Sequence, residues 1–156
     1  MIRMNRAFVH AIRSLRGGGK RPLVSELKEI ARGGIINIDG CSLLAREVGH
    51  TNATVNDFPD KTGFECFVNH IHLDEYALEF LIGQTICFVS EVLNDWNKKH
   101  AEGELNAIVG LKDGATVRFH RRRENEFWLA GDLDGYNEAI LEISSSDTEF
   151  FDLILA

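Results

Sequence analysis

The apolar residues between positions 78 and 99 constrain the fold of this chain more than any other feature of its sequence. They recur every three or four positions, so in a helix they form one stripe: Leu78, Leu81, Ile82, Ile86, Val89, Val92, Leu93 and Trp96. Phe80 and Phe88 widen this stripe. A helix with so broad an apolar face is stable only when that face is covered. We therefore predict a long helix that is capped by Asp74, ends near Lys99 and packs across a sheet.

Two shorter helices are predicted before this long one. Residues 5–16 carry apolar side chains at helical spacing and run into three glycines at positions 17–19. Residues 24–31 form a second apolar pattern, which stops before Gly33 and Gly34. The glycines mark the end of each helix, because they leave the helical backbone conformation at little cost.

The segment between these helices and the long one predicts two strands and a loop. Residues 35–38 favour a strand that turns at the Asp-Gly pair 39–40. Residues 51–63 are rich in Asn, Asp and Thr, which predicts a surface loop. Residues 64–73 are apolar on both alternating faces, the pattern of a central strand.

After the long helix the sequence favours antiparallel strands. Residues 106–111 and 115–120 flank Asp113 and Gly114, which readily adopt the positive φ of a tight hairpin turn. Three further segments follow, the last of which fits either a strand or a short helix: 126–130, 138–143 and 150–155. The predicted fold class is therefore α+β, with an antiparallel sheet packed against a long central helix and with N-terminal helices.

The length and the cysteine content limit the classes of protein to which this chain can belong. A chain of 156 residues suits one hydrophobic core, so we expect residues 1–156 to form a single domain. Its cysteines, at positions 41, 66 and 87, form no CxxC pair and predict reduced, buried thiols in a cytoplasmic protein. No apolar run reaches the roughly 20 residues that span a bilayer. Residues 1–25 have the basic, amphipathic composition of an organelle presequence, but we expect them to form the first helix of the fold.

The net charge of −7 is divided unevenly along the chain. Residues 1–34 contain 8 Lys or Arg and 2 acids, whereas residues 35–156 contain 9 Lys or Arg and 22 acids. Residues 124–156 contain 9 acids and no Lys or Arg. Aromatic residues lie between these acids: Phe127, Trp128, Tyr136, Phe150 and Phe151.

This acidic, aromatic segment predicts an interface with a basic protein. Aromatic side chains beside charges are typical of protein interfaces, whereas an acidic surface repels nucleic acid. The candidate binding residues are Glu124, Glu126, Trp128, Asp132, Asp134, Tyr136 and Glu138. Two alternatives remain open at this stage. The acids could simply keep the surface solvated, or they could receive the basic N-terminal helices of a second copy in an oligomer.

The sequence His70-Ile71-His72-Leu73-Asp74 is the one pattern that suggests chemistry. Residues i and i+2 of a strand point to the same side, so His70 and His72 could bind one metal ion with Asp74. The pattern resembles the metal motif of metallo-β-lactamase-fold hydrolases, which implies a small metal-dependent hydrolase as the alternative function. That family has a histidine where this chain has Glu75, and only His100 and His120 follow as further histidine ligands. The other interpretation is that both histidines make hydrogen bonds at a strand end; we predict no cofactor and no complete catalytic constellation.

Residues 67–76, with the sequence FVNHIHLDEY, resemble bacterial immunity proteins of contact-dependent growth inhibition systems. The resemblance implies a cytoplasmic protein that binds and blocks the toxic C-terminal domain, often a nuclease, delivered by a neighbouring cell. It carries over no catalytic residue. A nuclease presents a basic surface to its phosphate substrate, which is the complement of the acidic segment. We therefore expect an immunity protein that neutralises a basic toxin domain without contacting nucleic acid or membrane.

Overall fold

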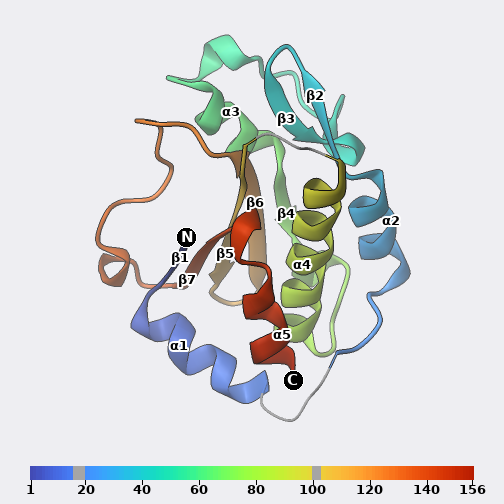
Figure 1. The fold of residues 1–156 in the computed structure, drawn as a ribbon, viewed down its shortest axis with the longest axis vertical. Coiled ribbons are helices and arrows are strands. Elements are labelled where there is room, and N and C mark those ends of the chain that lie inside the picture. Colours follow the sequence, from blue (N-terminus) through green and yellow to red (C-terminus); the bar gives the residue numbers. More distant parts are fainter. Residues whose placement is uncertain (16–19, 100–102) are drawn as a thin grey trace.

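The computed structural model describes residues 1–15, 20–99 and 103–156. Helix α4 (Leu81–Lys99) lies across one face of a sheet, between α2 (Ser25–Gly33) and α5 (Glu149–Leu155) (Figure 1). Within the described residues this sheet has five strands, all antiparallel, in the order β1 (Ile2–Met4), β7 (Ala139–Ser144), β5 (Leu105–Leu111), β6 (Ala115–Arg121), β4 (His70–His72). The α+β class is confirmed, as are its antiparallel sheet, long central helix and N-terminal helices.

Helix α4 buries the predicted stripe but begins later than its N-terminal signals suggested. Its buried face includes Ile86, Phe88, Val89, Val92, Leu93 and Trp96. Phe80 precedes the helix with φ 53°, a left-handed conformation that cannot continue into a right-handed helix. Asp74 therefore does not cap α4; its Oδ1 accepts from the Ala115 backbone N–H at 3.1 Å. Leu78, predicted on the buried stripe, is 93% exposed.

The N-terminal region forms the two predicted helices and one strand that has no sequence signal. Asn5 caps α1 (Arg6–Ile12), which continues as a 3₁₀ turn at Arg13–Leu15. The predicted glycine stop at positions 17–19 lies outside the described residues. Helix α2 ends where predicted, at Gly34 with φ 66°. Strand β1 has only three residues, too few to show an alternating pattern.

The predicted central strand at residues 64–73 is wrong. The segment is mostly helix α3 (Lys61–Val68), followed by the short edge strand β4. Asp60 caps α3 by accepting from the Gly63 N–H at 2.8 Å, and this helix also occupies the end of the predicted 51–63 loop. A short run that is apolar on both faces fits a buried helix as well as a strand, so periodicity could not separate them.

The predicted hairpin at residues 106–120 forms, and the predicted strand and turn at residues 35–40 belong to a second hairpin whose other strand was not predicted. Strands β2 (Ile35–Ile38) and β3 (Cys41–Leu44) pair around Asp39 and Gly40, with φ of 51° and 80°. Strands β5 and β6 pair around Asp113 and Gly114, with φ of 54° and 152°. Positive φ at both turn residues matches the twist of the flanking strands.

The predicted strand at residues 126–130 does not form. Residues 122–138 instead make a long loop, which we call the 122–138 loop and which extends from the sheet in orange in Figure 1. Its regular structure is a 3₁₀ turn at Leu133–Gly135. The chain then enters β7, which lies between β1 and β5, and ends as helix α5. None of the described helices combines the length and apolar character needed to cross a bilayer.

Candidate functional site

The two faces of the five-stranded sheet differ in chemistry. The face against α4 carries fully buried apolar side chains, among them Ala107, Val109, Val117, Phe119, Leu141 and Ile143. Because side chains alternate along each strand, the opposite face carries the intervening residues. We call this the polar sheet face; its members include Arg3, His70, Asn106, Arg118, His120 and Glu142. The 122–138 loop packs against it, and a partly open cavity lies between loop and sheet.

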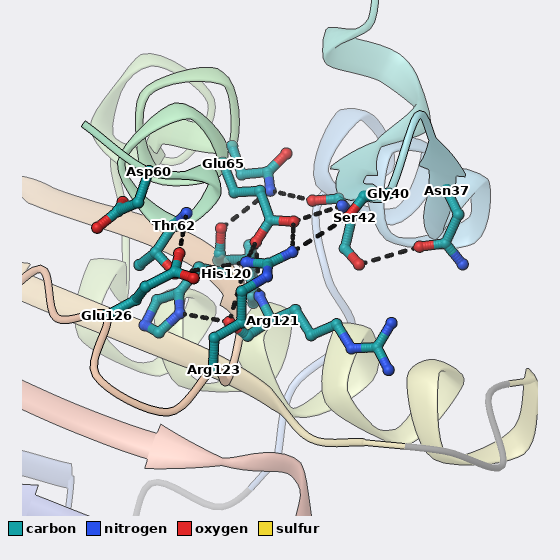
Figure 2. Close-up of polar contacts among 12 residues, drawn as sticks. Asn37, Gly40, Ser42, Asp60, Thr62, Glu65, His120, Arg121, Arg123 and Glu126 are labelled. Atoms are coloured by element: carbon teal, nitrogen blue, oxygen red, sulfur yellow. Dashed lines mark hydrogen bonds and ion pairs between the residues drawn. The ribbon is translucent and has the colours of Figure 1, made fainter. Parts of the chain in front are cut away.

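A buried ion pair holds the start of the 122–138 loop (Figure 2). Glu65, fully buried on α3, binds both terminal nitrogens of Arg123 at 2.7 Å each. Its carboxylate also accepts from the backbone N–H of Ser42 at 2.5 Å and of Arg121 at 2.8 Å. These bonds join α3, β3, β6 and the loop, and donating hydrogen bonds to the Glu65 carboxylate raises the pKa of Arg123.

A second set of contacts holds the other end of the loop. The Asn5 side chain donates to the carbonyl oxygens of Leu133 at 3.1 Å and Glu138 at 2.8 Å. Within the loop, the Ala130 N–H donates to the Tyr136 hydroxyl at 2.9 Å. The Arg118 guanidinium lies 4.8 Å from the centre of the Trp128 ring, a cation–π contact between sheet and loop. The loop is therefore fixed at both ends and in its middle.

The structure divides the predicted binding residues into two groups. Glu124, Asp132 and Asp134 are exposed on the loop, and Trp128 is 39% exposed. The other three are partly buried: Glu126 accepts from the Thr62 N–H, Tyr136 accepts from Ala130, and Glu138 lies near Arg118.

Phe127 was not among those predicted binding residues, yet it is 78% exposed. It lies between Glu126 and Trp128, at the centre of the predicted segment. Its exposure could have been predicted from the sequence, because this aromatic residue lies among acids in a segment that lacks the alternating apolar and polar pattern of a strand.

Four of the C-terminal acids are paired with the basic N-terminal region of the same chain. The pairs are Arg3–Glu142 at 2.8 Å, Lys20–Asp152 at 2.6 Å, Arg6–Asp134 at 3.8 Å, and the Met1 ammonium with Asp147. The docking that the oligomer alternative placed between two copies thus occurs within one chain. Among the described residues, the other five acids take part in no ion pair, and the exposed ones, Glu124, Asp132 and Glu149, contribute to the surface field.

The cavity beneath the loop has a volume of about 460 Å³. Its lining includes Asn106, His120 and Glu142 from the sheet and Phe127, Trp128 and Leu129 from the loop. Asn106 and His120 are both buried, and the Asn106 Oδ1 and His120 Nε2 atoms have no hydrogen-bond partner in the part of the chain that the structure describes. Neither residue was singled out as a binding residue from the sequence, because only the pairing of β5 with β6 brings them together.

The predicted histidine pair is present, but Asp74, the predicted third metal ligand, is already hydrogen-bonded elsewhere. The rings of His70 and His72 lie on one side of β4 with their centres 4.4 Å apart. The carboxylate of Asp74 is bound to the Ala115 N–H. No cluster of three or more His, Cys, Asp or Glu that could hold a metal ion occurs in the described ranges, and His100 lies outside them. The described residues therefore provide no metal site for the hydrolase alternative.

A family model for the Uncharacterized protein PM0498 family matches residues 3–152. The chain belongs to this family. One relative, Uncharacterized protein PM0498 of Pasteurella multocida (strain Pm70), is 26% identical over 139 residues, which cover 81% of this chain and 87% of the relative. No solved structure matches the chain. The PM0498 family match spans the polar sheet face and the whole 122–138 loop.

In this PM0498 family member, His70 is expected to make stability depend on pH. Burial, followed by the charges of Arg118 and His72, lowers the pKa of His70 from 6.5 to about 4. Below pH 6.5 the unfolded chain binds a proton at this ring, while the folded protein resists protonation down to about pH 4. The free energy of unfolding should therefore fall as pH decreases through this window.

Urea unfolding measured across that pH window tests the His70 prediction. His70→Gln should flatten the pH dependence, whereas His10→Gln, at an exposed position on α1, should leave it unchanged. Equal slopes for His70→Gln and the wild-type protein would contradict the prediction.

Proposed function

We propose that this protein is an immunity protein that binds and neutralises a basic toxin domain, a nuclease, in the bacterial cytoplasm. The observation that carries the proposal is the exposure of Phe127 and Trp128, 78% and 39%, on a loop that is fixed at both ends. The same loop carries the exposed acids Glu124, Asp132 and Asp134.

Aromatic anchors on a fixed loop favour tight binding. Interface energy is concentrated in a few residues, among which Trp and other large side chains recur. A loop that is already ordered by Glu65, Asn5 and Tyr136 loses little conformational freedom when a partner binds. Such preformed anchors suit an inhibitor, which must hold its target for long periods.

The electrostatics support a basic target. The chain carries a net charge of −7, and three of its N-terminal basic residues, Arg3, Arg6 and Lys20, form ion pairs with C-terminal acids. A nuclease domain has a cationic surface for phosphate, so an acidic loop would steer the encounter and occupy that surface. This complementarity also explains why the protein would not itself bind nucleic acid.

An immunity gene lies directly after the gene of its toxin, so the test uses the C-terminal domain of the protein encoded directly upstream of this chain's gene, produced in an inactivated form. Calorimetric titration should give tight, salt-sensitive binding. Phe127→Ala should weaken the affinity about 30-fold, as expected for an aromatic anchor. The double reversal Glu124→Lys/Asp132→Lys should lower the association rate about 10-fold at low salt.

Matched controls separate the loop from overall charge. The double reversal Glu79→Lys/Glu91→Lys changes net charge by the same amount at exposed positions outside the loop. It should reduce the association rate much less than the loop reversal. In cells, the wild-type chain should restore growth against the active domain and Phe127→Ala should restore it poorly. Absence of binding by the wild-type chain would refute the proposal, and equal effects of both reversals would remove the loop from the interface.

A further inference from the structure

The floor of the cavity beneath the 122–138 loop is formed by an unusual pair of side chains. Asn106 and His120 lie directly opposite each other on β5 and β6, and each is only 3% exposed. Among the described residues, neither the Asn106 Oδ1 nor the His120 Nε2 atom has a hydrogen-bond partner. Native proteins rarely leave buried polar atoms unpaired, because each one costs stability. Two of them side by side, at the base of one cavity, indicate a site for something that supplies their hydrogen bonds.

Both unpaired atoms are acceptors. The His120 Nδ1 atom lies 2.9 Å from the Arg121 carbonyl oxygen, which can only accept, so Nδ1 carries the proton (Figure 2). In the neutral ring the Nε2 atom then presents a lone pair. The Asn106 Oδ1 atom is a carbonyl oxygen. A molecule that binds here must therefore donate hydrogen bonds through an O–H or N–H group.

Most of the charged groups around the cavity are already paired. Arg3 is bound to Glu142 at 2.8 Å, Arg122 to Glu104 at 2.8 Å and Arg123 to Glu65 at 2.7 Å. Glu126 accepts from the Thr62 N–H and lies near Arg123. Among the described residues that line the cavity, no arginine is therefore left to neutralise an anionic ligand. The remaining lining is apolar and aromatic: Phe127, Trp128 and Leu129.

We propose that this cavity binds a small neutral molecule that combines an apolar ring with a hydrogen-bond donor, as phenols and indoles do. The ring packs against the loop residues Trp128 and Leu129, and the donor reaches the acceptors of Asn106 and His120. The volume of about 460 Å³ falls within the range of small-molecule sites. This proposal does not rest on toxin binding, although Phe127 and Trp128 belong to both sites, because its test uses the protein alone.

Paired probes that differ only in the donor test this inference. In NMR titrations of the ¹⁵N-labelled protein, p-cresol should bind about 10-fold more tightly than toluene, the value of one well-formed hydrogen bond. It should shift the His120 Nε2 and Trp128 indole resonances. Anisole, which can only accept, should bind no better than toluene. Absence of p-cresol binding, or equal affinity for p-cresol and toluene, would overturn the proposal and leave a cavity that holds water.

Two variants separate the acceptors from the shape of the cavity. Asn106→Leu and His120→Phe each replace one acceptor with an apolar group, so each should reduce the preference for p-cresol over toluene. Thr116→Val, on the polar sheet face but outside this cavity's lining, should keep the full preference. Thermal melts confirm that each variant is folded, and either acceptor variant suffices if the other does not fold. A folded Asn106→Leu variant with the wild-type preference for p-cresol would exclude Asn106 from the site.

Discussion

Replacing Glu65 with alanine is expected to lower the free energy of unfolding by about 3–5 kcal/mol, the cost of leaving a buried charge without its partner. The substitution removes both bonds to Arg123 and leaves the backbone N–H groups of Ser42 and Arg121 unpaired. Because this cluster joins α3 and β3 to the first residues of the 122–138 loop, the loop should also lose order. Urea unfolding gives the energy, and Trp128 fluorescence reports on the loop.

A surface ion pair from the same stretch of chain provides the control for Glu65. Arg122 is bound to Glu104 at 2.8 Å, but both side chains are substantially exposed. Arg122→Ala should therefore cost less than about 1 kcal/mol. If Glu65→Ala cost no more than Arg122→Ala, the buried cluster would not stabilise the fold as its geometry indicates.

Asn5→Ala should lower the free energy of unfolding by about 3 kcal/mol, from several hydrogen bonds worth about 1 kcal/mol each. The buried Asn5 side chain accepts from the N–H groups of Phe8 at 3.0 Å and Ile140 at 2.9 Å. It donates to the carbonyl oxygens of Leu133 and Glu138. One side chain thus caps α1, binds β7 and closes the end of the 122–138 loop, and thermal or urea unfolding measures its contribution.

Two further substitutions resolve the roles of Asn5. Asn5→Asp keeps the accepting oxygen but loses both donor bonds to the loop, so it should retain the cap of α1 while loosening the loop. Ser14→Ala removes an exposed side-chain bond to the Ala11 carbonyl and should cost a few tenths of a kcal/mol at most. An Asn5→Ala variant as stable as Ser14→Ala would contradict this assignment.

Local signals account for the parts of the fold that the sequence predicted correctly. The stripe in α4 spans many turns, and the two Asp-Gly turns require specific backbone angles, so each is recorded in neighbouring residues. Residues 64–73 lacked such a signal, since an apolar run on both faces fits helix and strand equally. The long helix began late because of the left-handed conformation of Phe80, which no pattern announces.

The candidate site was predicted only in part, for a physical reason. The exposed acids and Trp128 of the loop are adjacent in sequence, so their composition indicated a binding surface. Glu65 and Arg123 are 58 residues apart, and Asn106 meets His120 only through strand pairing. Contacts of this kind form only in the complete tertiary structure, so no pattern among neighbouring residues in the sequence predicts them. The prediction that this loop binds a basic toxin stays a prediction until the titrations are made.

The pairing of β1 with β7 has a consequence for synthesis on the ribosome. Arg3 and its partner Glu142 are separated by 139 positions, so the first strand emerges long before the strand that it joins. At typical translation rates this delay is on the order of 10 s. During that time β1 has no neighbouring strand, and the apolar side of the nascent N-terminal region is not covered by the sheet. Only when β7, the last strand, is made can β1 pair.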